Sequence, residues 1–482
     1  MKNLAILAAA ALASSQAFGQ TVSTPITFSA GVASAYFGRS LAAGDFNGDG
    51  LRDLLIGAPA NLGEDITGIR AYTTAGKAYI FYGPDFTTSI ELGNPNPAAF
   101  DSYGWAVAAG AAGGVTDAAY VSAPLHQGGP GTTNFGAVHY YLDPSTAPDS
   151  VLTLTNPTPA TAPPTSLGTS IAFAPSSTPS ASTLVIGATG FSSGLVDTNG
   201  LVWRTSASAP TPPAGNLGPC VEPGFGSAVA VLPIVPFAGG SVIIGNPYAL
   251  RNYASGICEN VSEQMGRLHH GSIPGLNSHW YEKSPDNSLG TALATGVTEA
   301  GGLRTAAGAP FSNQVYIFDR NPAFNNPFGG PGIHPVTGLP NPAFGEPLQV
   351  LDVTAAGHAG RSVALADMDL DGSLDLIVGA PLGYPLGGRV VVFFGPAPYS
   401  DASRVNLDLP GFAPESGFCP DDLLGWSLVA ADFNGDGRLD VAAGRPCDGL
   451  AEEGSVTVFF GCSGAGDCES CTGGFCQLPP TP

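Results

Sequence analysis

Three short segments of the chain place carboxylate and amide side chains at alternate positions. They occupy residues 45–53, 367–375 and 432–440, and each matches the pattern D-x-[DN]-x-D-G-x-x-D. Alternate side chains of such a loop can face inward together, and the glycine at position six permits the sharp turn. Because Ca²⁺ accepts about six to eight hard oxygen ligands in a flexible arrangement, whereas Mg²⁺ demands a stricter octahedron, the pattern predicts Ca²⁺ sites.

The position of each residue in the loop predicts its role. Positions one, three, five and nine supply side-chain oxygens, and position seven supplies its backbone carbonyl, so that the side chain at position seven plays no part. The predicted metal ligands are Asp45, Asn47, Asp49, Leu51 and Asp53; Asp367, Asp369, Asp371, Ser373 and Asp375; and Asp432, Asn434, Asp436, Arg438 and Asp440. About three Ca²⁺ ions per chain are therefore expected.

Two alternatives to this assignment can be weighed. An EF-hand needs an acidic residue at position twelve, but those positions hold Ile56, Val378 and Ala443, and the same count argues against a dockerin. Ordinary water-solvated turns are the other alternative. This alternative is disfavoured because all three loops have the same position in the repeat. Each starts seven residues after a repeated glycine (45 − 38, 367 − 360, 432 − 425) and ends four residues before another (57 − 53, 379 − 375, 444 − 440).

A longer repeat carries these loops. Its first landmark is an apolar residue followed by glycine, at Phe37-Gly38, Tyr103-Gly104, Leu167-Gly168, Phe225-Gly226, Leu289-Gly290, Ala359-Gly360 and Leu424-Gly425. Successive glycines are 66, 64, 58, 64, 70 and 65 residues apart, too regular for coincidence and too long for one hairpin. Units of this length predict four-stranded blades, and hence an all-β fold, a seven-bladed β-propeller.

Each unit holds further strand signals. A second landmark ends the second strand, at Gly57-Ala58-Pro59, Ser122-Ala123-Pro124, Gly187-Ala188-Thr189, Gly245-Asn246-Pro247, Gly308-Ala309-Pro310, Gly379-Ala380-Pro381 and Gly444-Arg445-Pro446. The third strand is rich in aromatic and β-branched residues, as in segments 78–82, 390–394 and 456–460. The last unit lacks a fourth strand, and residues 26–29 form an unassigned strand-like segment. We expect that segment to complete the seventh blade and close the ring.

This combination resembles the FG-GAP repeat of integrin α-subunits, most clearly at Phe37-Gly38, the loop 45–53 and Gly57-Ala58-Pro59. The resemblance extends from the mature N-terminus to Gly461. It implies a seven-bladed propeller with calcium on its lower face and partner binding on the opposite face or rim. Units two to five depart from it, with Ala109-Gly110-Ala111, Phe173-Ala174-Pro175, Val231-Leu232-Pro233 and Thr295-Gly296-Val297 in place of the acidic loop. Those blades should hold no metal, and no integrin stalk or β-subunit is implied.

Domain boundaries follow from the repeat and from the chain ends. Residues 1–19 resemble a signal peptide with a small-residue cleavage site, residues 20–461 form the predicted propeller with blades starting near 37, 103, 167, 225, 289, 359 and 424, and residues 462–482 form a Cys-rich tail. No later stretch approaches the roughly 18 apolar residues that a transmembrane helix needs. The formal charge of −22 disfavours nucleic acid. We therefore expect a secreted or cell-surface protein without membrane insertion.

Eight cysteines in an exported chain predict disulfides. Equivalent repeat positions predict Cys220 with Cys258 and Cys419 with Cys447. The tail residues Cys462, Cys468, Cys471 and Cys476 are expected to pair among themselves, with a zinc knuckle as the alternative. Cys258 belongs to a long polar segment that also holds Glu259, Glu263, His269, His270 and His279. Its spacing matches no metal-ligand motif, and we predict a loop on the propeller rim that could contact a partner.

These observations favour a protein- or glycan-recognition or adhesion module over an enzyme. Residues 190–194 match the G-x-S-x-G elbow of hydrolases, but no helical pattern follows, as the elbow requires. An exported hydrolase of phospholipase type is nevertheless an alternative, since some phospholipases carry this repeat. A structural cell-surface component tethered by the Cys-rich tail is another. Catalytic residues and an organic cofactor are not expected.

Overall fold

The fold is known from a computed structural model of the chain. The structure describes residues 25–33, 35–60, 75–95, 97, 101–113, 116–126, 136–146, 148, 151–155, 165–176, 182–190, 200–207, 215–217, 224–231, 241–250, 264–272, 279–285, 288–320, 332–333, 340–341, 347–353, 357–383, 387–409, 422–449, 451–463 and 471–476. The predicted signal peptide lies outside these residues. Within them the fold is all-β, without an α-helix.

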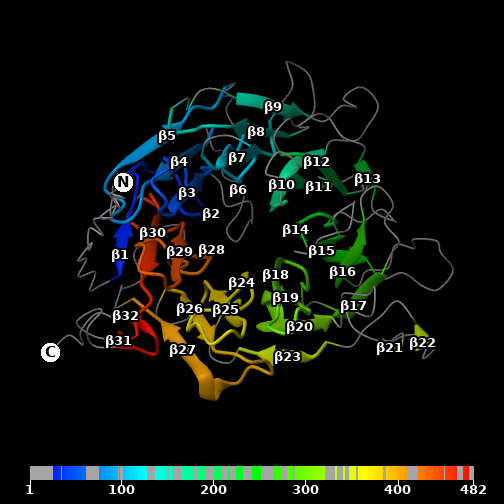
Figure 1. Cartoon of the computed structure of the whole chain (residues 1–482). Helices are drawn as coiled ribbons and strands as arrows, with labels where there is room; N and C mark the ends of the chain where they lie inside the picture. Colours follow the sequence, from blue (N-terminus) through cyan, green and yellow to red (C-terminus); the bar gives the residue numbers. More distant parts are fainter. Residues whose placement is uncertain are drawn as a thin grey trace, which may run out of the picture.

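Seven four-stranded antiparallel sheets form a ring of blades, as Figure 1 shows. In chain order the first six blades comprise β2 (Ser40–Gly44), β3 (Asp53–Ala58), β4 (Lys77–Phe81) and β5 (Ser89–Leu92); β6 (Val107–Gly110), β7 (Ala118–Ala123), β8 (Ala137–Tyr141) and β9 (Val151–Thr155); β10 (Thr165–Ala174), β11 (Thr183–Gly190), β12 (Leu201–Ser206) and β13 (Gly215–Leu217); β14 (Ala228–Val231), β15 (Ser241–Leu250), β16 (Gln264–Ser272) and β17 (His279–Pro285); β18 (Ala292–Val297), β19 (Leu303–Ala309), β20 (Gln314–Arg320) and β23 (Gln349–Asp352); and β24 (Ser362–Ala366), β25 (Asp375–Ala380), β26 (Arg389–Phe393) and β27 (Arg404–Leu407). The predicted seven-bladed propeller is therefore confirmed.

The seventh blade is built from both ends of the described chain. It contains β28 (Leu428–Ala431), β29 (Asp440–Arg445), β30 (Ser455–Phe459) and, as its outer strand, β1 (Ile26–Phe28). Strand β1 pairs antiparallel with β30, with Thr27 opposite Thr457. The expected ring closure is confirmed, and it leaves β30 without a free edge.

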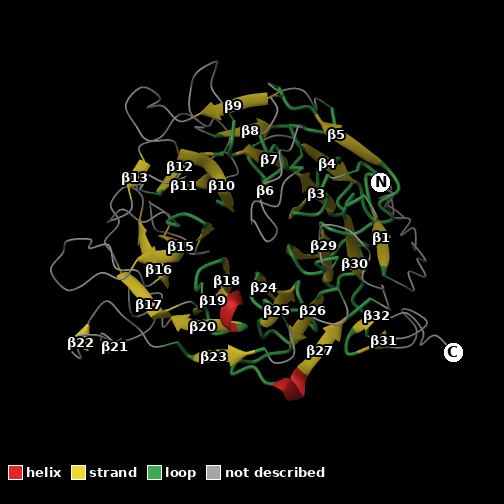
Figure 2. Ribbon diagram, turned by 180° about the vertical axis from the view of Figure 1, so that it is seen from behind, coloured by secondary structure: helices red, strands yellow, loops and turns green. Residues whose placement is uncertain are grey.

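A few short elements lie outside the blades. They are the two-stranded sheets β21 (Gly332–Ile333) with β22 (Pro340–Asn341) and β31 (Cys471–Thr472) with β32 (Phe475–Cys476), and the 3₁₀ turns η2 (Pro310–Ser312) and η3 (Asp401–Ser403), which are drawn as helix in Figure 2. In the part of the chain that the structure describes, no helix is long and apolar enough to cross a membrane.

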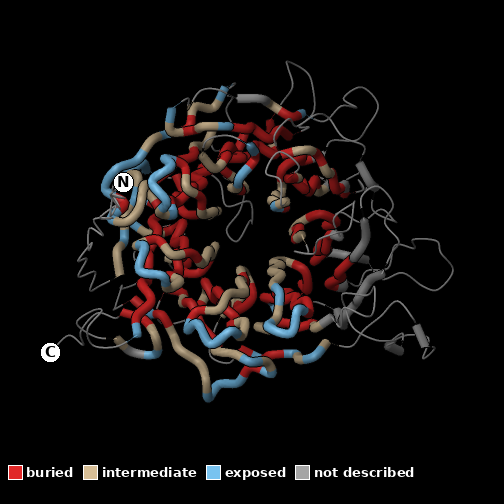
Figure 3. The backbone as a smooth tube through the Cα atoms, in the orientation of Figure 1, coloured by how far each residue is buried: buried red, intermediate tan, exposed pale blue. Residues whose placement is uncertain are grey.

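Burial follows the position of a strand within its blade. The second strands β3, β7, β19, β25 and β29 are buried along their whole length, whereas first strands such as β2 are mostly half-buried. Figure 3 shows the buried backbone running as a band around the ring. Apolar clusters join neighbouring blades, and Phe37 of the blade 1 entry packs with Val456 of blade 7. Each blade thus buries its faces against the next one.

The two landmark glycines meet where neighbouring blades touch. A Cβ atom on Gly57 would lie 1.9 Å from the carbonyl oxygen of Gly104 in the next blade. The same clash, at 1.9–2.1 Å, recurs at the equivalent glycines 187, 245, 308, 379 and 444. The other partner, Gly104, has a positive φ of 94°, which favours glycine. Both glycines of the repeat therefore serve blade packing.

Polar contacts reinforce the same junctions. The hydroxyl groups of Ser40 and Ser362 donate to the carbonyls of Gly104 and Gly425 in the following blades, at 3.0 and 2.7 Å. Arginine side chains also stack across two boundaries, Arg39 over Trp105 at 3.8 Å and Arg361 over Trp426 at 4.0 Å. Such contacts add cation–π attraction to the apolar packing.

One sequence prediction about blade 4 was wrong. The histidine-containing segment is not a rim loop, because His269 and His270 belong to β16 and His279 to β17, the outer half of the blade. His269 is 2% exposed, and its ring meets Phe225 edge-on at 5.0 Å. The imidazole therefore serves as a packing group between strands.

The Cys-rich tail folds back onto blade 7. Cys462 and Cys471 form a disulfide, as expected for pairing within the tail. Cys447 and Cys476 each take part in a disulfide as well. The tail hairpin pairs backbone with backbone, because the Cys476 N–H donates to the Phe460 carbonyl at 2.9 Å. The predicted partners Cys419, Cys468, Cys220 and Cys258 lie outside the described residues.

Candidate metal centres

The three acidic loops connect the first and second strands of blades 1, 6 and 7. They join β2 to β3, β24 to β25, and β28 to β29, so that all three lie at the same end of their blades. Two of them also touch, since a Cβ on Gly435 of the blade 7 loop would lie 2.7 Å from Leu51 of the blade 1 loop. The loops thus share one face of the ring.

The ninth residue of each loop is a fully buried aspartate. One carboxylate oxygen accepts the backbone N–H at loop position two: Phe46 to Asp53 at 2.9 Å, Met368 to Asp375 at 2.7 Å and Phe433 to Asp440 at 2.9 Å. The other oxygen accepts an N–H at the end of the third strand: Gly83 at 3.0 Å, Gly395 at 2.6 Å and Gly461 at 2.9 Å. The aspartate therefore clamps the loop to the blade.

The earlier loop positions fold their side chains inward. Asp45 accepts the N–H groups of Gly48 and Gly50 at 2.7 and 3.1 Å, and Asp432 accepts those of Gly435 and Gly437 at 2.8 and 2.9 Å. At position seven, Leu51, Ser373 and Arg438 donate their N–H to the aspartate at position five, at 2.8, 2.7 and 2.8 Å. These hydrogen bonds hold each loop in a closed, compact conformation. That the carbonyls at position seven are metal ligands stays a prediction.

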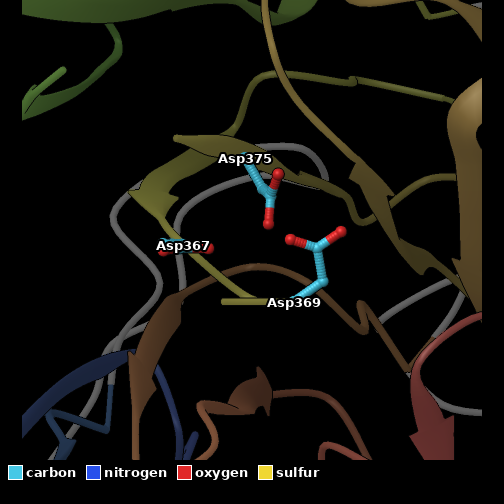
Figure 4. Close-up of side chains that lie close together, drawn as sticks. All are labelled: Asp367, Asp369 and Asp375. Atoms are coloured by element: carbon cyan, nitrogen blue, oxygen red, sulfur yellow. The ribbon is translucent and has the colours of Figure 1, made fainter. Parts of the chain in front are cut away.

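The blade 6 loop gathers three carboxylates around one point. Asp367, Asp369 and Asp375 each place an oxygen within 4.8 Å of the others. Figure 4 shows the carboxylates of Asp369 and Asp375 facing each other. Asp367 Oδ1 is buried and makes no hydrogen bond within the described part of the chain, although its Oδ2 accepts the Gly372 N–H. Three hard oxygens, one of them buried and unsatisfied, suit a divalent cation.

Burial disfavours the ionised form of the ninth aspartate in each loop. It raises the pKa of Asp53 and of Asp375 to about 6 and that of Asp440 to about 7, and the neighbouring loop aspartates add to the rise. Backbone hydrogen bonds from positions such as Phe46 and Gly83 act in the opposite direction. A bound cation would compensate the ionised form, and protonation is the alternative when no cation is present.

Calcium bound at these loops is predicted to stabilise the protein in a pH-dependent way. In metal-free protein, the stability that comes from the raised pKa values of these aspartates is fully present below about pH 4. It is lost as the pH rises from there through the folded-state pKa values of about 6 to 7. Calcium needs the ionised carboxylates, so the increase in melting temperature on adding calcium should grow from pH 5 to pH 7.5. Thermal denaturation of the calcium-free and the calcium-saturated protein across this range measures it. An increase that stays constant would contradict the assignment.

Comparison with known proteins bears on the same three blades. A family model described as "FG-GAP repeat" matches residues 37–81, 359–393 and 424–459, which lie in blades 1, 6 and 7. The chain contains FG-GAP repeats. The three matched segments are the same three blades that carry the acidic loops. The family model and the loop geometry therefore identify the same blades.

Similar proteins match only part of the chain. The chain is 35% identical over 113 residues to phosphatidylinositol-glycan-specific phospholipase D of Bos taurus, 38% over 122 residues to integrin alpha-3 of Cricetulus griseus, and 39% over 109 residues to integrin alpha-7 of Homo sapiens. These alignments cover 22%, 24% and 22% of this chain, but only 12%, 11% and 8% of the respective relatives. The chain therefore matches a small part of each relative.

Blades outside the FG-GAP matches replace the ninth aspartate. Blade 2 holds Ala118 there, and its neighbour Asp117 turns to blade 1, where it accepts the Asp45 N–H at 2.9 Å and the Arg52 guanidinium at 3.0 Å. In blade 5 the position belongs to Arg304, which pairs with Gly296 in the register that places Asp53 opposite Gly44. The sequence pattern predicts the missing acidic loops but not these substitutes. Counting four residues back from the second landmark glycine could have found Arg304.

Proposed function

We propose that this chain is a secreted, calcium-binding FG-GAP propeller that acts as a recognition or adhesion module for a protein or glycan ligand. The observation that carries the proposal is the repetition of one carboxylate arrangement in three blades. Each loop has a buried ninth aspartate, tied to its blade through both oxygens, beside inward-facing carboxylates. A ring rigidified in this way presents its loops as a stable surface.

The residues present fit a calcium ion in each FG-GAP blade. Side chains at positions one, three, five and nine and the carbonyl at position seven would hold it, as the sequence pattern predicts. When bound, calcium neutralises loop carboxylates that otherwise repel one another, such as Asp367, Asp369 and Asp375. The chain's own part is to pre-arrange these oxygens, since the ninth aspartate is already clamped. Calcium thus has a structural role in this proposal.

A non-enzymatic role accounts for the way in which the repeats use the chain. Seven blades and the tail hairpin contain nearly all the described residues, and no catalytic constellation was identified from the sequence. The chain is also similar to a phospholipase D, although the alignment covers only 12% of that protein. A hydrolase of phospholipase type is therefore the second candidate. A structural cell-surface component is the third.

Calcium titration tests the metal assignment. After chelation and desalting, isothermal titration should give about three bound ions per chain, together with a higher melting temperature. Asp49→Asn, Asp371→Asn and Asp436→Asn should each remove one ion. Asp401→Asn is the matched control, because Asp401 is an exposed aspartate outside the loops that pairs with Arg404. No bound ion, or no loss in any loop variant, would overturn the calcium assignment.

Ligand assays then separate the functional candidates. The recognition module should bind partners on glycan and extracellular-protein arrays with calcium and lose them with chelator. A phospholipase should instead release product from phosphatidylinositol-glycan substrates. A structural component should stay on washed cells of its source. Hydrolytic activity that stays with the protein through purification would reject the non-enzymatic proposal.

A further inference from the structure

Blade 5 carries a buried cation where the FG-GAP blades carry a buried carboxylate. Arg304 takes the ninth loop position and is 6% exposed. Its guanidinium forms a bidentate pair with Asp319 of β20, from Nε to Oδ1 at 2.6 Å and from Nη2 to Oδ2 at 2.7 Å. The fork geometry holds the guanidinium plane in one orientation. Its remaining amino group, Nη1, therefore points in a defined direction.

That direction leads into blade 6. Arg304 Nη1 donates to the hydroxyl of Tyr399 at 3.1 Å, and the guanidinium lies 5.6 Å from the tyrosine ring. Tyr399 is 3% exposed and lies between β26 and β27, just ahead of η3. Gln349 of blade 5 holds the same residue by its backbone, because its side chain donates to the Tyr399 carbonyl at 2.6 Å and accepts the Tyr399 N–H at 2.7 Å. Blade 5 thus fixes both the backbone and the hydroxyl.

The tyrosine passes this restraint to the acidic loop of blade 6. Its hydroxyl proton is donated to the carbonyl of Leu374 at 2.7 Å, and Leu374 is the residue immediately before Asp375. The Leu374 side chain also packs against blade 5, where a Cβ on Gly296 would lie 2.7 Å away. From the other side, the Gly395 N–H holds Asp375 Oδ1 at 2.6 Å. The end of the loop is therefore gripped from two blades.

We propose that Tyr399, oriented by Arg304 and Gln349, is a positioning residue for the calcium loop of blade 6, so that calcium affinity in blade 6 depends on blade 5. The inference rests on the proposed calcium binding. Tyr399 is no ligand, because its hydroxyl proton is committed to the Leu374 carbonyl and its oxygen to the guanidinium. Occupying the carbonyl at position eight leaves the one at position seven, Ser373, for the ion.

Blade 1 supplies a natural contrast. Its corresponding connection holds Phe86, which has no hydroxyl and packs edge-on against Phe433 of blade 7 at 5.8 Å. In blade 1 this connection therefore meets the neighbouring blade through aromatic packing. Replacing Tyr399 with phenylalanine would give blade 6 a comparable apolar connection while keeping the ring in place, so that the variant removes only the hydrogen-bonded link.

The experiment isolates one site at a time. In a background with Asp49→Asn and Asp436→Asn, calorimetric calcium titration reports the blade 6 site alone. There Tyr399→Phe should weaken the calcium affinity about fivefold, the order of magnitude expected for losing the hydrogen bond to the Leu374 carbonyl. Arg304→Lys, which keeps the charge but not the fork, should weaken it by a similar factor. The matched control places Tyr399→Phe in a background with Asp371→Asn and Asp436→Asn, where the blade 1 affinity should not change.

The possible outcomes separate the two levels of the argument. A loss confined to blade 6, with metal-free melting temperatures within the range of the parent protein, supports the inference. An unchanged blade 6 affinity overturns it, and so does an equal loss in blades 1 and 6, which would show general loosening of the fold. If the parent with the intact blade 6 loop binds no calcium, the calcium assignment itself fails and this inference fails with it.

Discussion

Replacing Gly57 with alanine is expected to lower the free energy of unfolding by about 3 kcal/mol, the upper end for overpacking in a close-packed interior. The added methyl group would lie 1.9 Å from the carbonyl oxygen of Gly104 and 2.3 Å from the hydroxyl oxygen of Ser40. Both neighbours belong to a junction between blades, so that relief requires blades 1 and 2 to move apart. Urea denaturation measures the change through the transition midpoint.

Two controls separate steric clash from the loss of glycine itself. Gly31→Ala tests an open position, since Gly31 has a φ of 67° but no atom within 4 Å of an added Cβ; it should lower stability by only about 1 kcal/mol. Ser122 of blade 2 already stands where Gly57 stands in blade 1. Ser122→Gly adds no clash and loses the hydrogen bond that Ser122 Oγ accepts from the Ala106 N–H at 2.9 Å, so it should lower stability by only about 1 kcal/mol. Equal midpoints for Gly57→Ala and Gly31→Ala would refute the packing role of the landmark glycine.

Removing the residues up to Ser29 should be the second large effect, with a loss of about 3–5 kcal/mol. The truncation deletes β1, and with it the pairing to β30 and the aromatic contacts of Phe28. The Phe28 ring stacks on Phe86 at 5.1 Å and lies 4.8 Å from Phe81. The truncation also leaves β30 as an unpaired edge strand, which promotes aggregation. Thermal denaturation and light scattering together measure both consequences.

A complementation assay controls for indirect effects of the truncation. A synthetic peptide of residues 24–31 should bind the truncated protein as an added strand and restore much of the lost melting temperature. The same peptide with Phe28→Ala should restore less. Thr27→Ala, at an exposed position, keeps the ring packing and loses only the hydroxyl bond to Thr457, so it should restore more than Phe28→Ala. A truncated protein as stable as the full chain would show that β1 contributes nothing to closure.

The repeat made most of the fold predictable from sequence. Six of the seven blade junctions place glycine on both sides, with Ser122 the exception, so that the landmark pairs recur in the chain with the period of the ring. Buried third strands need aromatic and β-branched residues, and those residues mark β4, β26 and β30 directly. The missing fourth strand of the last blade then pointed to residues 26–29. In each case a tertiary requirement leaves a local sequence signal.

Blade 4 shows where such signals fail. Strand β16 has the sequence QMGRLHHGS, in which leucine is the one branched aliphatic residue, so that strand preference alone does not reveal it. Its place is decided by contacts with distant residues. A Cβ on Gly266 would lie 2.1 Å from the backbone nitrogen of Leu289 in the next blade, and His269 packs on Phe225. Tertiary packing overrides a weak local preference there.

The candidate metal centres also contain features that the sequence predicts and features that it does not. The candidate ligands of each loop could be proposed from the sequence because they lie within nine residues at alternate positions. The bonds that clamp the loops were not, since Asp53 meets Gly83 across 30 residues and Arg304 meets Tyr399 across 95. Those partners depend on which strands become neighbours, and no local pattern in the loop encodes that.

The last blade's shared construction also bears on the order in which the molecule can form. The hydroxyls of Thr27 and Thr457 bond at 2.9 Å although 430 residues separate them. Contacts of such high sequence separation form late and slowly, because a long loop must close first. During synthesis the early blades can stack as an open arc while the N-terminal strand waits unpaired. Completion of the circle is therefore expected to be the slow, final event of folding, and the interval before it the period of greatest exposure to chaperones and proteases.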